Sequence, residues 1–211
     1  MGAELLHAQS TDNRLIPLTN YGIKSMSMGY LIHPTAPVVW RGLMVMKALQ
    51  QLLHEVDWTS TTGQGGGLDI LVLDLPPGTG DTQLTITQQV ELSGAVIIST
   101  PQDVALSDAV KGVEMFRKVG VGILGLVQNM SVFKCKGCGK ETHVFGKEGV
   151  RRWGEGNGVD LLGDVRLDGK ICEDSDRGYP TVVSEGVDGE RSRVFMDMAD
   201  QIGKKIGLEK P

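Results

Sequence analysis

Residues 68–81 read LDILVLDLPPGTGD, an apolar run that reaches Asp74 and then opens into a turn rich in proline and glycine. Apart from Asp74, residues 70–75 are apolar at every position, so both faces of this segment are expected to be buried. A strand that is buried on both faces is typical of a parallel sheet covered by helices. The stretch therefore predicts a strand over 70–75 and an α/β fold around it.

The rest of the chain alternates between strand and helix patterns. Hydrophobic periodicity predicts further strands over 21–32, 95–100, 121–128 and 161–165, and helices over 41–56, 81–90, 104–119, 147–156 and 192–206. Strands that alternate with helices of this length form βαβ units with right-handed crossovers. The sequence shows no internal repeat and no clear domain boundary. We therefore expect one doubly wound, mostly parallel α/β domain over residues 1–211.

Composition narrows the classes of function. The 211-residue chain has a net charge of −5, which argues against a nucleic-acid surface or a polybasic membrane patch. No apolar run approaches the roughly 18–20 residues that a membrane span needs, so we expect a soluble chain with no stable membrane insertion. The first fifteen residues resemble neither a secretory signal nor a convincing mitochondrial transit peptide. Three cysteines, two of them in one C-x-x-C, favour a reducing compartment.

The C-x-x-C is the strongest candidate for chemistry. Cys135 and Cys138 lie in FKCKGCGKETH, where a tight turn directs two thiolates toward one point, as soft-metal sites require. Two ligands are half of a tetrahedral site, and a symmetric dimer is the simplest completion. Zinc at the same four thiolates, a zinc site within one chain that His143 completes in part, and a redox or inert dithiol stay open as alternatives. Cys172 is predicted to be a buried small hydrophobe rather than a third ligand.

The run that ends at Asp74 also has a nucleotide interpretation, because nucleotide-hydrolysing proteins place a strand-end carboxylate beside a magnesium ion. The matching phosphate-binding sequence, G-x-x-x-x-G-K-[ST], is not in the chain. The chain has four Gly-Lys pairs, and the residues that follow them are Glu141, Glu148, Ile171 and Lys205, never Ser or Thr. From spacing alone, a plain buried strand is the simpler explanation.

Longer segments add a resemblance that covers about residues 13–206. The matching segments are NYGIKSMSMGYL (20–31), APVVWRGLMVMKALQQLL (36–53), VLDLPPGTGDTQLTITQQ (72–89), LSGAVIISTPQDVAL (92–106), VQNMSVFKCKGCGKETHVFG (127–146) and SDRGYPTVVS (175–184). Together they resemble the Mrp/ApbC family of P-loop ATPases that carry iron–sulfur clusters. Within that family they are most similar to the mitochondrial Ind-type (NUBPL-like) branch.

The resemblance implies a SIMIBI-class P-loop fold whose phosphate-binding strand and KGGVGKS-like loop would precede Met1. It implies that ATP and magnesium bind, with Asp74 near the metal, Gly78 in the loop that responds to the γ-phosphate, and Asn129 and Asp168 beside the adenine. Turn formation alone is the alternative for Asp74 and Asn129. For the chain as written we expect no ATPase activity. An apolar sheet edge left exposed would make the chain poorly stable or associated with a partner.

The resemblance also implies a labile [4Fe–4S] cluster held by Cys135 and Cys138 of two copies in a homodimer. Apo iron–sulfur proteins would receive the cluster, with respiratory complex I as the target system. The implied compartment is the mitochondrial matrix, and the cytoplasm, where bacterial members act, is the alternative. Two other functions stay open: a zinc-bridged dimeric interaction module, and a catalytically dead fragment that regulates a longer partner.

Overall fold

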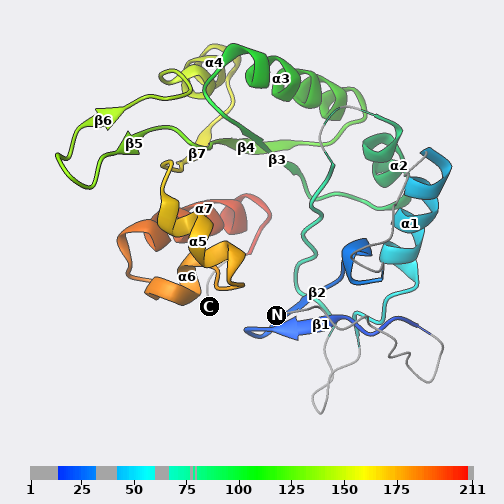
Figure 1. Cartoon of the computed structure of the whole chain (residues 1–211). Helices are drawn as coiled ribbons and strands as arrows, with labels where there is room; N and C mark the ends of the chain where they lie inside the picture. Colours follow the sequence, from blue (N-terminus) through cyan, green and yellow to red (C-terminus); the bar gives the residue numbers. More distant parts are fainter. Residues whose placement is uncertain (1–13, 32–41, 60–66, 77, 79, 209–211) are drawn as a thin grey trace. The chain divides into compact units, whose positions relative to one another are not determined.

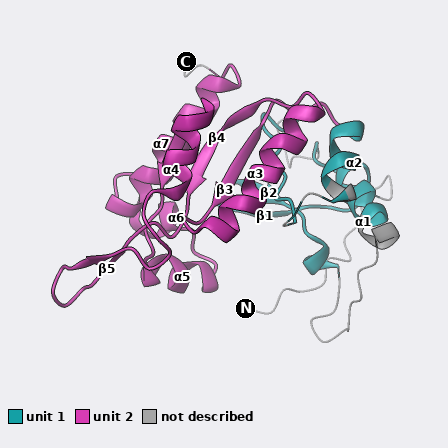
Figure 2. Ribbon diagram, turned by 90° about the horizontal axis from the view of Figure 1, so that it is seen from above, with its two compact units in different colours: residues 1–89 teal, residues 90–211 magenta. Residues whose placement is uncertain are grey.

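The computed structural model describes residues 14–31, 42–59, 67–76, 78 and 80–208. The chain divides into two compact units, Met1–Gln89 and Val90–Pro211, which are coloured separately in Figure 2. The expectation of one domain over 1–211 stays a prediction.

Unit 1 begins with a hairpin where the sequence predicts one strand over 21–32. Strands β1 (Leu18–Asn20) and β2 (Ile23–Ser25) pair antiparallel around a two-residue turn. Tyr21 and Gly22 both have positive φ, 52° and 77°, as the commonest tight hairpin turn requires. A 3-10 helix, η1 (Met28–Tyr30), follows the hairpin. The prediction of a single strand is therefore wrong, because the chain reverses at the start of the predicted segment.

The two helices of unit 1 confirm their predictions. Helix α1 spans Gly42–His54 and helix α2 spans Asp81–Gln89. Ala48 on α1 and Ile86 on α2 are buried, and so is Val56 just after α1. Unit 1 therefore has a small apolar core built from its two helices and the start of the described chain.

The strand predicted over 70–75 is not a strand in this structure. Residues 67–76 run without helix or sheet assignment, and Ile70, Leu71 and Val72 are exposed. An extended segment becomes a strand only when its N–H and C=O groups pair with a neighbour. Within the described chain, no such neighbour pairs with residues 68–75. The predictions of a strand and of burial on both of its faces are therefore wrong for this segment, because the pairing that the apolar pattern implies is not made among the described residues.

Unit 2 contains the parallel sheet. Its strands are β3 (Ala95–Ser99), β4 (Ile123–Gln128) and β7 (Leu161–Asp164), in the order β3-β4-β7. Both neighbouring pairs are parallel, and the three ranges agree with the predicted strands to within two residues. This sheet with its flanking helices confirms the α/β class.

Helices cover both faces of this sheet. Helices α3 (Asp103–Lys118) and α4 (Gly149–Asn157) lie on one side in Figure 1, and α7 (Glu190–Lys205) lies on the other. Val113 of α3 and Val150 of α4 are almost completely buried. Beneath the opposite face, Val127, Leu162, Val165 and Met198 form a cluster that Ile171, Val194, Phe195 and Ile202 complete. No described helix is both long enough and apolar enough to cross a membrane.

Three elements of unit 2 were not predicted. They are helix α5 (Gly169–Asp176), helix α6 (Thr181–Glu185) and a short hairpin made by β5 (Phe133–Lys134) and β6 (Glu141–Thr142). The helices are short and rich in polar residues, so their hydrophobic period is weak. Each strand of the hairpin has two residues, which is too short for an alternating apolar pattern to be recognised in the sequence.

Candidate functional site

The two cysteines lie on the β5–β6 hairpin, which reaches away from the sheet in Figure 1. Phe133 pairs with Thr142 and Lys134 with Glu141. The Cys135 N–H donates to the Lys140 carbonyl at 3.0 Å, and the Gly139 N–H donates to the Cys135 carbonyl at 2.9 Å. These bonds close a turn that carries Cys135 and Cys138 at the end of the hairpin.

The turn also lowers the pKa of one thiol, that of Cys135. The backbone N–H of Cys138, then that of Gly137 and the Cys138 thiol hold the pKa of Cys135 below its ordinary value, against a smaller opposing effect of burial. A lower pKa favours the thiolate, which is the form that binds metal. Cys138 is exposed and Cys135 is half-buried. The hairpin therefore presents an accessible pair of soft donors.

His143 does not complete a site with this pair. Its Nδ1 lies 3.1 Å from the Ser131 carbonyl oxygen, at the base of the hairpin. Among the described residues, no group of three or more His, Cys, Asp or Glu side chains is placed to hold a metal ion. The alternative of a zinc site completed by His143 within one chain therefore gains no support. Within this turn each chain therefore offers two thiols, those of Cys135 and Cys138, as candidate metal ligands.

The third cysteine contradicts its prediction. Cys172 is exposed on α5, and its Sγ lies 3.8 Å from Asp176 Oδ2. The preceding residue, Ile171, packs on the core instead, and Asp174 is buried. The prediction of a buried Cys172 failed because the helix that sets its orientation was not recognised.

A pocket of about 740 Å³ lies beside the hairpin, at the ends of β4 and β7. Cys135 and Asp168 both line it, as do Gln128 and Asp164. Gln128 is 2% exposed, and its Nε2 donates to Asp164 Oδ2 at 3.2 Å while its Oε1 accepts from the Val150 N–H at 3.2 Å. One amide thus joins two strand ends to the start of α4. Sequence analysis missed Gln128, although a polar residue that ends an apolar strand was a visible signal.

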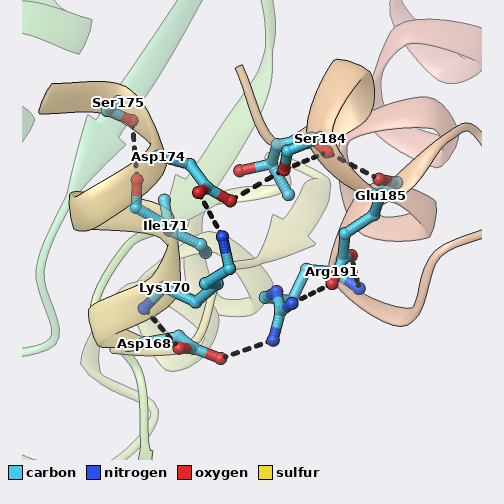
Figure 3. A network of polar contacts seen from close by, with 10 residues as sticks. Asp168, Lys170, Ile171, Asp174, Ser175, Ser184, Glu185 and Arg191 are labelled. Atoms are coloured by element: carbon cyan, nitrogen blue, oxygen red, sulfur yellow. Dashed lines mark hydrogen bonds and ion pairs between the residues drawn. The ribbon is translucent and has the colours of Figure 1, made fainter. Parts of the chain in front are cut away.

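Both carboxylate oxygens of Asp168 have partners within unit 2. Its Oδ1 accepts from the Lys170 N–H at 2.8 Å and so caps α5, and its Oδ2 lies 3.3 Å from Arg191 Nη1 (Figure 3). Burial raises the pKa of Asp168, but the Lys170 N–H and the Arg191 guanidinium outweigh burial and bring that pKa below its usual range. Its predicted place beside a bound adenine stays a prediction.

Asn129 begins a turn after β4. Its Oδ1 accepts from the Met130 N–H at 2.9 Å, and its own N–H donates to the Ser99 carbonyl at 2.8 Å. Met130 has a positive φ of 54°, and its N–H is the one that donates to the Asn129 side chain. The turn interpretation of Asn129 is thus met, and its adenine role stays a prediction.

Asp74 and Gly78 belong to unit 1, where the loop after Asp74 is held from α2. The Gln83 side chain is 3% exposed, and its Nε2 donates to the carbonyls of Pro76 at 2.9 Å and Gly78 at 2.8 Å. Asp74 itself is exposed. The magnesium and γ-phosphate roles of these residues stay predictions.

A polar network, absent from the sequence predictions, fastens the three C-terminal helices (Figure 3). Asp174 on α5 is 4% exposed, pairs with Lys170, and accepts from Ser184 Oγ on α6 at 2.7 Å. Arg191 on α7 pairs with Glu185 of α6. The network holds α5 and α7, which line the pocket, in a fixed arrangement.

Residues 1–203 match the family model described as "ParA: NUBPL iron-transfer P-loop NTPase". The chain belongs to this family. A solved structure with a similar fold is a nucleotide-binding protein from Archaeoglobus fulgidus in complex with ADP. It superposes with a TM-score of 0.64 at 32% identity and covers 81% of this chain and 63% of that one. The match confirms the P-loop NTPase-like α/β fold.

Several proteins that are similar to this chain have names that refer to iron–sulfur clusters or iron–sulfur proteins. The "Iron-sulfur cluster transfer protein NUBPL" of Mus musculus is 52% identical over 93% of this chain and 59% of its own length. The "Iron-sulfur protein required for NADH dehydrogenase, mitochondrial" of Arabidopsis thaliana is 51% identical over 92% and 60%. The "Iron-sulfur cluster carrier protein" of Escherichia coli (strain K12) is 42% identical over 98% and 54%. The chain thus spans a little more than half of each relative.

Proposed function

We propose that this chain is an iron–sulfur cluster carrier that takes up its cargo at Cys135 and Cys138 and delivers it to apo proteins. The observation that supports this most directly is the exposed C-x-x-C turn, with two accessible thiols and a lowered pKa at Cys135. The family match and the names of the relatives point the same way. An exposed position suits a carrier because the cargo has to reach a second protein.

The cargo we infer is a [4Fe–4S] cluster that bridges two copies of the chain. A cluster of this type takes four cysteine thiolates, and each hairpin supplies two. Symmetric pairing of two hairpins supplies all four without a further residue. Zinc takes the same donors, so the experiment below has to separate the two metals.

The recipients we infer are subunits of respiratory complex I, in the mitochondrial matrix. A relative that is 51% identical carries NADH dehydrogenase and the mitochondrion in its name. ATP and magnesium would act on the carrier through Asp74, Gly78, Asn129 and Asp168, an inference supported by the ADP bound to the solved neighbour.

Anaerobic reconstitution with ferrous iron and sulfide tests the proposal. We expect a brown protein with visible thiolate-to-iron absorption, about four iron atoms per two chains, and a dimer on gel filtration. Cys138→Ala should abolish the colour, and Cys172→Ala, at the exposed cysteine of α5, should leave it unchanged. A monomer that takes up the full iron and sulfide content would contradict the shared site. Colourless protein with stoichiometric zinc would favour the interaction module.

A further inference from the structure

Charge is distributed unevenly over this acidic chain. Residues 133–152, FKCKGCGKETHVFGKEGVRR, hold six Lys and Arg residues against two Glu, a net charge of +4. The whole chain carries −5, so the remaining residues carry −9. The positive segment is the cysteine hairpin together with the start of α4.

Most of the positive charge of this segment is directed to solvent, although Arg151 pairs with Asp164 at 3.6 Å. Lys134, Lys136, Lys140 and Lys147 are all exposed. None of the four forms a direct ion pair with a described carboxylate, although Lys136 acts on Asp168 through space. A lysine that stabilises the fold usually has a partner or packs its stem, so these lysines are available for intermolecular contact.

We propose that the hairpin is a cationic docking face for an acidic surface on the protein that exchanges cargo with this chain. This inference rests on the proposed carrier function. Lys134, Lys136 and Lys140 flank Cys135 and Cys138 in the same turn. Any protein that takes a cluster from these thiols has to approach the turn to within bonding distance. Complementary charge speeds such an encounter and selects the approaching surface.

Other anionic partners fit less well. An anionic membrane or a nucleic acid is an extended polyanion, and it would also meet the −9 carried by the rest of the chain. A folded acidic protein can meet the projecting hairpin alone, because charges more than about 8 Å apart are largely screened at physiological salt. A second copy brings the same positive segment, so charge alone does not select it.

A charged peptide tests the docking face without any cluster. The probe is a fluorescent peptide of alternating glutamate and glycine, and its binding to the reduced, metal-free chain is followed by anisotropy at low and at high salt. We expect K134Q/K136Q/K140Q to bind it at least about tenfold more weakly than the unaltered chain at low salt, and high salt to remove the difference. The matched control is K111Q/K118Q/K204Q, which changes three exposed lysines on α3 and α7 and gives the same net charge. Its binding should stay within about twofold.

Four outcomes would overturn the proposal. They are equal weakening in both triple variants, binding that salt does not change, no binding at low salt, and equal binding of a lysine–glycine peptide to the unaltered chain. Tight binding to phosphatidylglycerol vesicles, lost in K134Q/K136Q/K140Q only, would assign the face to a membrane instead. Because the protein is metal-free, these results are independent of whether iron and sulfide load at the cysteines.

Discussion

Single buried amides decide the geometry at the strand ends. Gln128 has one acceptor and one donor engaged, with Val150 and with Asp164. Gln128→Leu keeps roughly the volume of the side chain but leaves the buried N–H of Val150 without its acceptor, whereas Asp164 Oδ2 keeps its ion pair with Arg151 at 3.6 Å. We expect it to lower the free energy of unfolding by about 1–3 kcal/mol in urea titrations, which is the usual cost of one buried donor without a partner.

The control for this change is Gln102→Leu. Gln102 precedes α3, is exposed, and makes no side-chain capping bond. The same chemical change there should alter stability by no more than about 0.5 kcal/mol. Equal losses in the two variants would mean that hydrophobic replacement, rather than loss of the Gln128 contacts, is responsible.

Sequence patterns identified the residues whose chemistry is local. The C-x-x-C turn was predicted because its two thiols are three positions apart and meet in one turn. Gln128 was not predicted, since its partners lie 22 and 36 residues further along the chain. Asp174 was missed for a similar reason: it is polar and yet buried, and Ser184 of another helix contributes to holding it. Burial of a polar group follows from tertiary partners, which a single segment does not reveal.

At the scale of elements, α4 approaches the loop after β3 so closely that one glycine is required. A Cβ on Gly149 would lie 2.0 Å from the Pro101 carbonyl oxygen, whereas a Cβ on Gly156 of the same helix meets nothing within 4 Å. Gly149→Ala should therefore cost at least about 2 kcal/mol through displacement of the helix or loop. Gly156→Ala should be neutral or stabilising by up to about 1 kcal/mol, since alanine favours helix.

Thermal and urea unfolding of the two α4 variants measure this difference. The two changes share a helix, a residue type and an added methyl group, so the steric contact with Pro101 is the variable that separates them. If Gly149→Ala were as stable as the unaltered chain, α4 would not pack against Pro101 as described.

The network that joins α5 to α6 should make stability depend on acid. Lys170 and then Ser184 hold the pKa of Asp174 below its ordinary value. A carboxyl with a lowered folded-state pKa stabilises the fold fully above its unfolded pKa of about 3.9, and that stabilisation is lost as the pH falls through the folded-state value. Asp174→Asn should therefore lower the melting temperature at pH 7 and reduce its further fall between about pH 5 and pH 2. Circular dichroism at a series of pH values measures both.

Asp197→Asn is the control for Asp174→Asn, because Asp197 is an exposed aspartate on α7. Its melting temperature at pH 7 should match that of the unaltered chain. A pH profile that is the same in Asp174→Asn as in the unaltered chain would show that other carboxyl groups, such as that of Asp160 beside Lys205, account for the acid sensitivity.

Elements were predicted where the hydrophobic period and the tertiary partners agree. The strands β3, β4 and β7 and the helices α1, α2, α3, α4 and α7 all have an apolar pattern that packing in the structure uses. The segment 70–75 has the same pattern without a paired neighbour among the described residues. Helices α5 and α6 have packing without a strong pattern, because polar contacts hold them. A strand forms only when two segments pair, so the sequence of one segment predicts an extended apolar conformation but not the neighbour with which it pairs.

At the scale of the whole molecule, burial is concentrated in unit 2. Among the described residues, the buried hydrophobic side chains of unit 1 are those of Ala48, Val56 and Ile86, and the others, from Ile97 to Met198, belong to unit 2. Burial of apolar area is the main stabilising contribution to a fold. Unit 2 should therefore have the higher local stability, and its central strand should be the last segment to open.

Hydrogen exchange followed by mass spectrometry measures this difference on the intact chain. Amides of β4 pair on both sides, with β3 and with β7, so they should exchange only through large-scale unfolding. Amides of residues 68–75, which precede Pro76, make no backbone hydrogen bond to the described chain and should exchange at least about a thousandfold faster than those of β4. A synthetic peptide of 68–76 gives the unprotected rate, and β3 and β7 give intermediate references within the same sample. Protection of the amides of 68–75 equal to that of β4 would show that the segment pairs as a strand in solution, as its sequence predicts, and would contradict the unpaired arrangement described above.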